Sequence, residues 1–374
     1  MKRIAFLPLA AFLLSAGHGA RPDRLTSEQS RTDLGTLGGT YSEAFAVNDE
    51  GQVVGASRTA SGQHHAFLWA NGAMQDLGTL GGQSSAAFDL NAVGHVVGWS
   101  AAASGEDHAF LWANGAMRDL APGRGMSHAV AVSNRGHVAG WVNPPGARHA
   151  FLWADGVMRD LGTLAGTFSE ASAVNDAGQV VGRSSSTAGP NHAFLWTNGA
   201  MLDLGTLGGT TSEALAINAH GQVAGKSRIT SGEIHAFLWT DGVMRDLGTL
   251  GGAFSTAVAL DDHGRVVGSS HTATGAEHAF LWTNGAMHDL GTLGGSLSSA
   301  AAVNRLGHVA GSSTTASGES HAFFWANGVM QDLGTLGGGF GTAVALNERR
   351  QVVGASKTST NHVHAALWTA APDP

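Results

Sequence analysis

One pentapeptide, His-Ala-Phe-Leu-Trp, recurs along most of the chain and constrains its fold more than any other feature. It first spans His65–Trp69, and its copies follow at intervals of 43 residues, with one interval of 41. The later copies begin at His108, His149, His192, His235, His278, His321 and His364, the last two with a single change each. A fixed period of this size is typical of a repeat architecture, in which each repeat forms one supersecondary unit.

The first repeat, residues 33–75, predicts four short β-strands. The four apolar runs are Ala44–Val47, Gln52–Ser57, His65–Trp69 and Met74–Leu77. None is long enough for a helix, and no stretch of the repeat has a helical apolar period. Four short antiparallel strands in about 43 residues match the size and content of one β-propeller blade.

Turn sequences separate these strands. Asn48–Gly51 suits a tight turn, because Asn favours its first position and Gly tolerates positive φ at its last. Asn71-Gly72 favours the type I′ turn of a two-residue hairpin, and Asn-Gly or Asp-Gly returns there in seven repeats. The glycine-rich segment Asp33–Gly39 predicts a loop before the first strand.

The number of repeats and the two ends of the array predict a closed ring. Each of eight repeats opens with Asp-Leu, at Asp33, Asp76, Asp119, Asp160, Asp203, Asp246, Asp289 and Asp332. The last repeat lacks a fourth strand, and a spare fourth-strand sequence, Thr32–Leu34, precedes the first. We therefore predict an all-β, eight-bladed propeller in which residues near 30–35 complete the sheet of residues 343–369. The alternative is a β-solenoid, which would need polar end repeats.

Three motifs together give the chain a resemblance to a known family. They are Asp-Leu-Gly-Thr-Leu-Gly-Gly, Asn-x-x-Gly-Gln-Val-Val-Gly and His-Ala-Phe-Leu-Trp-x-Asn-Gly, and they recur throughout residues 33–374. The chain resembles the bacterial extracellular HAF repeats, named for their His-Ala-Phe core. The resemblance implies export and a repeat fold, and it supplies no activity and no catalytic residues.

The N-terminal segment predicts export to the periplasm or the outside of the cell. Residues 1–20 combine a basic start, an apolar run too short to span a bilayer and a tail of small residues, which is typical of a signal peptide. A polar leader, residues 21–32, precedes the repeats, and we expect no membrane span in the mature chain. Cysteine is absent, and the formal net charge of −8 argues against nucleic acid as a partner. We expect a monomer.

The repeated histidines and tryptophans predict structure before chemistry. Eight histidines at one repeat position are distributed around a ring and would not converge on one ion. A hydrogen-bond network within each blade, with Asp and Ser partners, is the simpler interpretation. The repeated Trp predicts packing between blades. We expect no metal and no cofactor.

Function is expected where the repeats differ. The residue after Val-Val-Gly or Val-Ala-Gly is, in order, Ala56, Trp99, Trp141, Arg183, Lys226, Ser269, Ser312 and Ala355. A second variable position, after the glycine segment, holds Tyr41, Phe168, Phe254 and Phe340 in four repeats. Loops into the first strand and after the second lie on one face of a propeller, so we predict a ligand surface there, formed by Trp99, Trp141, Arg183, Lys226 and these four aromatics. The alternative is that Trp99 and Trp141 only fill gaps between blades.

Repeat 3 departs furthest from the others. Residues 119–128 replace the glycine segment, and Asn143–Gly146 replaces the second turn. Each change shortens its loop by one residue, and both loops belong to the predicted ligand face. They form one side of a binding site, or they have drifted in tolerant loops.

The sequence favours a binding protein over an enzyme. No motif for a serine nucleophile, a zinc protease, a P-loop or a calcium loop occurs. We therefore predict a non-catalytic propeller whose ligand is a carbohydrate or a cell-surface protein. One alternative is a carbohydrate-active hydrolase or lyase that uses acids such as Glu43, Glu170 and Glu213. Another alternative is a structural protein of the cell surface.

Overall fold

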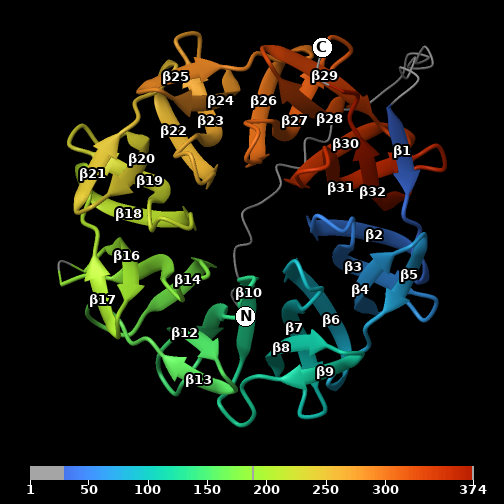
Figure 1. Ribbon diagram of the computed structural model, residues 1–374, viewed down its shortest axis with the longest axis vertical. Coiled ribbons are helices and arrows are strands. Elements are labelled where there is room, and N and C mark those ends of the chain that lie inside the picture. Colours follow the sequence, from blue (N-terminus) through green and yellow to red (C-terminus); the bar gives the residue numbers. More distant parts are fainter. Residues whose placement is uncertain (1–28, 188, 373–374) are drawn as a thin grey trace.

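A computed structural model describes residues 29–187 and 189–372 as a ring of eight four-stranded antiparallel sheets (Figure 1). Within these residues there is no helix. The predicted signal peptide and most of the predicted leader lie outside the described residues. The innermost strand of each blade faces the centre of the ring, and the fourth strand lies at the rim (Figure 1).

The strands follow the predicted order within each blade. Blades 1 to 4 contain β2 (Gly38–Val47), β3 (Val53–Thr59), β4 (His64–Ala70), β5 (Ala73–Asp76); β6 (Gly81–Leu90), β7 (Val96–Ala102), β8 (Asp107–Ala113), β9 (Ala116–Asp119); β10 (Ser127–Val132), β11 (Val138–Val142), β12 (His149–Ala154), β13 (Val157–Asp160); β14 (Ser169–Val174), β15 (Val180–Ser185), β16 (Asn191–Thr197) and β17 (Ala200–Asp203). Blades 5 to 8 contain β18 (Gly208–Ile217), β19 (Val223–Ile229), β20 (Ile234–Thr240), β21 (Val243–Asp246); β22 (Gly251–Leu260), β23 (Val266–Thr272), β24 (Glu277–Thr283), β25 (Ala286–Asp289); β26 (Gly294–Val303), β27 (Val309–Thr315), β28 (Ser320–Ala326), β29 (Val329–Gly334); β30 (Gly337–Leu346), β31 (Gln351–Thr358), β32 (Val363–Thr369) and β1 (Ser30–Asp33).

The ring closes through the N-terminal strand, as predicted. Strand β1 pairs antiparallel with β32, with Asp33 opposite Ala366, and the Leu34 amide donates to the Ala365 carbonyl at 3.0 Å. Blade 8 also contacts blade 1 directly, because Asn347 Nδ2 donates to the Asn48 carbonyl at 2.9 Å. These contacts exclude the open solenoid. Strand β1 begins at Ser30, so the end of the predicted leader belongs to the propeller.

The innermost strands are longer than the sequence predicted. Strand β2 begins at Gly38, inside the segment that was predicted to be a loop, and its partner register shifts between Gly38 and Ser42. Gly39 permits β2 to lie close to β3 here, since a Cβ on Gly39 would lie 2.6 Å from the Cβ of Arg58 and 2.8 Å from its carbonyl oxygen. The prediction of a loop at residues 38–39 was therefore wrong. Its glycines allow two strands to lie closer than side chains would permit.

Two other glycine positions explain features that the repeats share. The Asn71-Gly72 hairpin has φ values of 53° and 82°, as a type I′ turn requires, so that prediction is confirmed. Gly55 lies opposite a β-bulge between Ala44 and Ala46, where a Cβ would come within 1.9 Å of the Glu43 carbonyl oxygen. The glycine of Val-Val-Gly is thus required by the bulge in the innermost strand.

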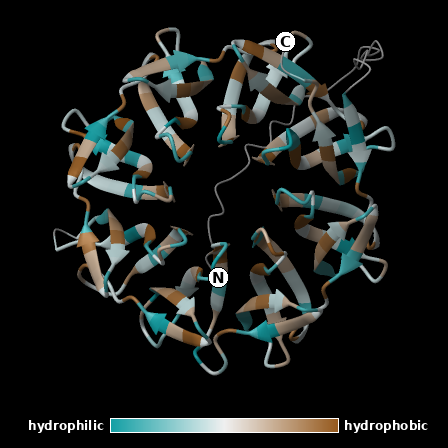
Figure 2. Ribbon diagram, in the orientation of Figure 1, coloured by the Kyte–Doolittle hydropathy of each residue, from teal (hydrophilic) through white to brown (hydrophobic). Residues whose placement is uncertain are grey.

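Eight apolar cores lie between neighbouring blades. In the core between blades 1 and 2, Val54 and Leu68 contact Val96 and Phe110, and Trp112 packs against them. The core between blades 8 and 1 has the same composition, with Leu34 contributed by the closing segment. Fully burying a side chain such as Phe110 contributes about 1.5–3 kcal/mol. The prediction that the repeated Trp packs between blades is confirmed. Outside these cores, Figure 2 shows hydrophilic residues at the ends of the outermost strands.

An asparagine belt joins the blades at the turns between first and second strands. Each belt asparagine donates from Nδ2 to the carbonyl of the equivalent residue in the next blade, at 2.9–3.2 Å. The belt consists of Asn48, Asn91, Asn175, Asn218, Asn304 and Asn347. In blade 6 Asp261 takes this place and binds Arg265, which donates to the Arg305 carbonyl of blade 7. In blade 3 the position is Ser133, which is too short to reach blade 4.

Candidate functional site

The repeated histidines have a structural role, as the sequence predicted. In all eight blades the His Nδ1 lies 2.7–2.9 Å from a carboxylate oxygen of the Asp on the fourth strand. The closing pair, His364 with Asp33, repeats this geometry across the ends of the chain. The predicted Ser partner differs, because Ser85 Oγ accepts from the Ala66 amide and not from His65. Residues 29–187 and 189–372 contain no group of three or more side chains arranged to hold a metal.

Two variable positions face each other across the first two strands of every blade. The residue after Val-Val-Gly or Val-Ala-Gly, here called the second-strand position, pairs with a residue on the innermost strand, here called the inner position. The inner positions are Glu43, Ala86, His128, Glu170, Glu213, Thr256, Ser299 and Thr342. Side chains at these two positions contact the adjoining blade as well as each other, so large residues can form a continuous row.

An aromatic row occupies these positions in blades 2 and 3. The His128 ring stacks on Trp99 of blade 2, with centroids 5.4 Å apart and planes 13° apart. The same ring lies 4.4 Å from the centroid of Trp141, its cross-strand partner. The Arg148 guanidinium in turn lies 4.1 Å over the Trp141 ring, which is a favourable cation–π distance.

An ionic row continues from Arg148 into blades 4 and 5. Arg148 Nη1 donates to one oxygen of Glu170, and Arg183 Nη2 donates to the other at 2.9 Å. Arg183 Nη1 lies 3.6 Å from Glu213, whose second oxygen lies 3.1 Å from Lys226 Nζ. We call the whole set the variable row: Trp99, His128, Trp141, Arg148, Glu170, Arg183, Glu213 and Lys226. Side-chain contacts within this row connect four successive blades, from blade 2 to blade 5.

Burial and neighbouring charges set the state of two members of the row. Burial lowers the pKa of His128, which is 5% exposed, and the nearby Asp107 carboxylate offsets only part of this effect. His128 is therefore neutral at pH 7 and stacks as an uncharged ring. Burial also opposes the charge of Arg183, but Glu170 and Glu213 outweigh it and raise its pKa. Arg183 therefore remains charged.

Asp89 is a half-buried acid beside the aromatic half. It directly follows the β-bulge of its strand, at a position that holds alanine in the other blades, such as Ala46 and Ala131. Its oxygens accept from the Leu90 amide at 2.9 Å and from the Val132 amide of blade 3 at 2.8 Å. Burial raises the pKa of Asp89 to about 7, although these two hydrogen bonds favour its charged form.

A hollow of about 490 Å³ opens between blades 3 and 4, next to Arg148. Its wall consists of the loop after the second strand of blade 3, residues 143–148, and Thr167 and Phe168 before β14. The innermost strands β10 and β14 have six residues, whereas those of the other blades have ten. Part of the hollow lies where the missing residues of β14 would be, since Thr167 and Phe168 directly precede that strand. The two loop types predicted to share one face do meet here.

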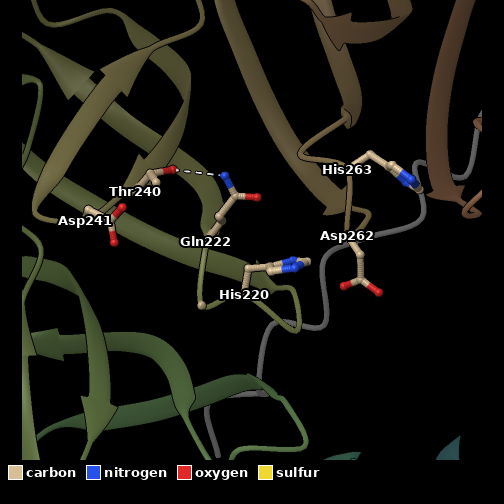
Figure 3. Close-up of a pocket in the computed structure, with 7 residues that line it drawn as sticks. His220, Gln222, Thr240, Asp241, Asp262 and His263 are labelled. Atoms are coloured by element: carbon tan, nitrogen blue, oxygen red, sulfur yellow. Dashed lines mark hydrogen bonds between the residues drawn. The ribbon is translucent and has the colours of Figure 1, made fainter.

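A second hollow, of about 380 Å³, lies between blades 5 and 6 (Figure 3). His220 and Gln222 line one side of it, and Asp262 and His263 line the other. Gln222 Nε2 donates to Thr240 Oγ1 at 3.3 Å (Figure 3), a contact that Gln179 and Thr197 repeat in blade 4. This hollow is lined largely by the turns that every blade shares, so it does not distinguish one part of the ring from another.

The structure brings together five of the eight predicted ligand residues. Trp99, Trp141, Arg183 and Lys226 belong to the variable row, and Arg183 lies 5.5 Å over the ring of Phe168. Trp141 is only 4% exposed, so it supports Arg148 from below and offers little surface of its own. The gap-filling alternative therefore describes Trp141 better than Trp99, which is half-buried.

The other three predicted aromatics do not join this site. Tyr41, Phe254 and Phe340 lie in blades 1, 6 and 8, within strands and not in loops. Tyr41 contacts His64, and Phe254 contacts His271. Phe340 pairs with Ser320 of the preceding blade. Among the described residues, the structure therefore shows no contact between these three aromatics and the variable row.

Three residues of this region escaped the sequence interpretation. His128 occupies the same inner position as Glu43, so comparing all eight residues of that column would have found it. Arg148 precedes the pentapeptide of blade 3, in a column that also varies widely. Asp89 is the single acid in a column of alanines. Each signal is visible in the aligned repeats, although none indicates which neighbours the side chain contacts.

The glutamates do not form the free acid pair that a hydrolase would use. Each oxygen of Glu170 accepts from a different arginine, and the two oxygens of Glu213 contact Arg183 and Lys226. Glu43 lies in blade 1. Burial raises its pKa, and a hydrogen bond from Tyr41 offsets only part of this rise. Glycoside cleavage requires one acid free to donate a proton and a second that attacks or activates water. These three carboxylates do not meet that requirement together.

Comparisons with known proteins agree with the fold and go no further. No family model and no curated protein sequence matches this chain. Among solved structures, it is similar to a puromycin-hydrolyzing peptidase of Mycobacterium tuberculosis, at 12% identity and a TM-score of 0.51, over 80% of this chain and 53% of that one. A puromycin hydrolase S511A mutant gives 14% identity and a TM-score of 0.51, over 89% and 60%. The BP39L lectin of Burkholderia pseudomallei gives 8% identity and a TM-score of 0.40, over 92% and 97%.

The fold and the site together define the class of this protein. The chain spans about half to three fifths of the length of the two hydrolases, and identities this low establish the fold alone. The protein is an eight-bladed β-propeller in which four successive blades carry one continuous variable row. Among residues 29–187 and 189–372, no helix is long and apolar enough to cross a membrane.

Proposed function

We propose that this protein is an exported propeller that binds a carbohydrate at the variable row without converting it. The observation that supports this most is the row itself. It connects half-buried Trp99, through His128 and Trp141, to three cationic side chains, whereas blades 6–8 have only Thr, Ser and Ala at the same positions. An aromatic face flanked by a few fixed hydrogen-bonding groups is the usual composition of a site for a sugar ring.

The size and polarity of the site favour a carbohydrate over a protein partner. The adjoining hollow of about 490 Å³ falls within the usual range for small-ligand sites. A stable protein interface needs about 800 Å² from each partner, with large apolar side chains near its centre. The exposed apolar residues here, such as Val157 and Val243 at 66% and 67% exposure, lie instead on separate rim hairpins.

Binding without chemistry follows from the engagement of the acids. Glu170 and Glu213 hold three cations in place, so their chemical role is to fix the shape and charge of the row. Export rests on the predicted signal peptide at residues 1–20 and on the resemblance to extracellular HAF repeats. A carbohydrate outside the cytoplasm is the ligand class that combines these features.

A glycan array on the secreted, processed protein tests this proposal. We expect specific glycan binding that falls at least about tenfold in Trp99→Ala, equivalent to about 1.4 kcal/mol. Tyr41→Ala is the matched control, because it removes an aromatic from the same face in blade 1 and is expected to leave binding unchanged. Absence of any glycan signal, or glycan binding that is indifferent to Trp99, would overturn the proposal.

A further inference from the structure

The hollow between blades 3 and 4 has fixed walls. The Arg148 amide donates to the Thr167 carbonyl at 2.9 Å, and the Ser169 amide donates to the Arg148 carbonyl at 2.7 Å. A turn closed by the Ala147 amide on the Pro144 carbonyl, at 3.1 Å, shapes the remaining side. The two walls belong to different blades and are held by backbone hydrogen bonds. A ligand therefore meets a site that is formed in advance.

Arg148 is the one charged side chain that lines this hollow. Its guanidinium is held from three directions: Nε donates to Asn143 Oδ1 at 3.0 Å, Nη1 donates to Glu170, and the plane stacks on Trp141. A guanidinium carries five N–H groups, so three of them remain outside these contacts. The side chain is 21% exposed, which leaves part of the guanidinium accessible from the hollow.

Several hydrogen-bond acceptors near the hollow are already used. Asn143 Oδ1 accepts from Arg148, and both oxygens of Glu170 accept from arginines. The Thr167 carbonyl accepts the Arg148 amide, and the Phe168 carbonyl accepts from Ser184 and Ser185. The three remaining N–H groups of the Arg148 guanidinium are the strongest donors that line the hollow. They favour a ligand that supplies acceptor oxygens, and a carboxylate matches the flat fork of a guanidinium.

The rest of the wall is suited to a ring. Phe168 and Pro144 line the hollow together with the small residues Gly146 and Ala147. Phe168 is half-buried and its ring is flanked by Arg183. Such a surface accommodates the apolar face of a sugar ring while the donors contact its oxygens.

We infer that this hollow binds an acidic sugar residue, a uronate, with its carboxylate on Arg148 and its ring against Phe168. This inference rests on the proposed function, since it names the class of sugar and the position of its charged group. The variable row then extends the site toward Trp99 for the neighbouring residues of the saccharide.

Titration calorimetry with matched saccharides tests the inference. The probes are trimers of galacturonate, glucuronate and mannuronate, each compared with its methyl ester, which keeps the ring and removes the charge. We expect at least one acid to bind tenfold or more tighter than its ester, with an affinity that falls as salt is added. A sulfated neutral trimer serves as a third arm, and we expect it to bind more weakly because a sulfate ester is a weaker hydrogen-bond acceptor than a carboxylate.

Three variants separate the roles of the wall residues. Arg148→Gln is expected to abolish the preference for acid over ester, and Arg148→Lys to reduce it, because Lys keeps the charge and loses the fork. Phe168→Ala is expected to weaken acid and ester alike. Arg245→Gln is the matched control, since Arg245 stacks on Trp282 of blade 6 at 5.0 Å and is expected to change nothing. Unfolding curves establish that each variant is folded.

The outcomes distinguish this inference from the proposed function. Equal binding of acid and ester, a preference that survives Arg148→Gln, or equal binding of the sulfated trimer would overturn the assignment of a carboxylate. A neutral glycan that needs Trp99, with no uronate bound, would overturn the inference and leave the proposed function standing. If no saccharide binds, both are wrong.

Discussion

Blades 6–8 and blades 3–5 have the same backbone register and different chemistry. In both groups a residue of the innermost strand pairs with the residue after Val-Val-Gly or Val-Ala-Gly, as Thr256 does with Ser269 and Glu170 with Arg183. Both groups keep the His–Asp pair and the apolar cores between blades. The comparison teaches that the ring does not require a particular side chain at this pair of positions. Side chains there can change without altering the fold.

The interface between blades 3 and 4 differs from the other interfaces of the ring. The asparagine belt lacks its link there because Ser133 replaces asparagine, and strands β10 and β14 are shorter than their equivalents. In their place, the Arg148–Glu170 pair connects the two blades by side chains. A site and a loss of regular structure thus coincide in one interface.

The largest loss of stability is expected from breaking the ring closure that both groups of blades share. Deleting residues 29–36 removes β1, the Asp33 partner of His364 and the buried Leu34. We expect the free energy of unfolding to fall by about 5 kcal/mol or more, since a buried Leu and several hydrogen bonds are lost together. Urea unfolding measures this, with deletion of residues 371–374 as the control. A midpoint equal to that of the parent would contradict closure by β1.

A smaller and equal effect is expected from the same hairpin change in either group of blades. Asn198 of blade 4 and Asn284 of blade 6 both have φ of 53°, and the glycines that follow them have φ of 83° and 84°. Replacing either Asn-Gly pair with Val-Val should cost about 2–4 kcal/mol, because β-branched residues avoid positive φ. Chemical unfolding of both variants makes the comparison. A cost in blade 6 without a similar cost in blade 4 would show that the two groups of blades do not share one scaffold.

Two substitutions in the asparagine belt are expected to change stability in opposite directions. Asn175→Ser removes the Nδ2 bonds to the Asn218 carbonyl and to Gln179, and should cost about 1–2 kcal/mol. Ser133→Asn introduces the missing donor toward blade 4 and should stabilise the ring by about 0.5–1 kcal/mol. Thermal unfolding of the two single variants measures both effects. A Ser133→Asn protein no more stable than the parent would mean that the interface between blades 3 and 4 cannot accept the regular link.

The smallest effect is a pH dependence confined to blade 2. Because burial raises the pKa of Asp89 to about 7, the folded state binds the carboxyl proton more tightly than the unfolded chain does. The contribution to stability is thus complete below about pH 4 and is lost as pH rises through 7. Relative to Asp89→Ala, the parent should lose about 1 kcal/mol of unfolding free energy between pH 6.5 and pH 8. A difference that is constant over this range would exclude an elevated pKa.

The fold could be predicted from the sequence because its evidence is local and repeated. Asn71-Gly72 specifies a turn by its own backbone requirements, and the spare segment at Thr32–Leu34 matches the strand missing from the last repeat. The extension of β2 to Gly38 was not predictable in this way. Glycines mark loops and close strand contacts alike, and only the partner at Arg58 decides between them.

The site was predictable only in part, for a geometric reason. Variable columns identified Trp99, Arg183 and Lys226, but the columns do not say which side chains meet across two blades. His128 contacts Trp99 of the preceding blade and Trp141 of its own, a relation that depends on how the blades are rotated against each other. The hollow depends likewise on two shortened strands in different blades.

The most direct test of the central claim is hydrogen–deuterium exchange with the saccharide that gives the strongest array signal. The claim is that ligand binding occurs at blades 2–5, and that the regular blades only support the ring. We predict that the saccharide slows exchange in residues 121–128, 143–149 and 165–170, and leaves the equivalent residues 294–298, 315–321 and 337–341 unchanged. Protection confined to blades 7 and 8, or spread equally over all eight blades, would contradict the claim.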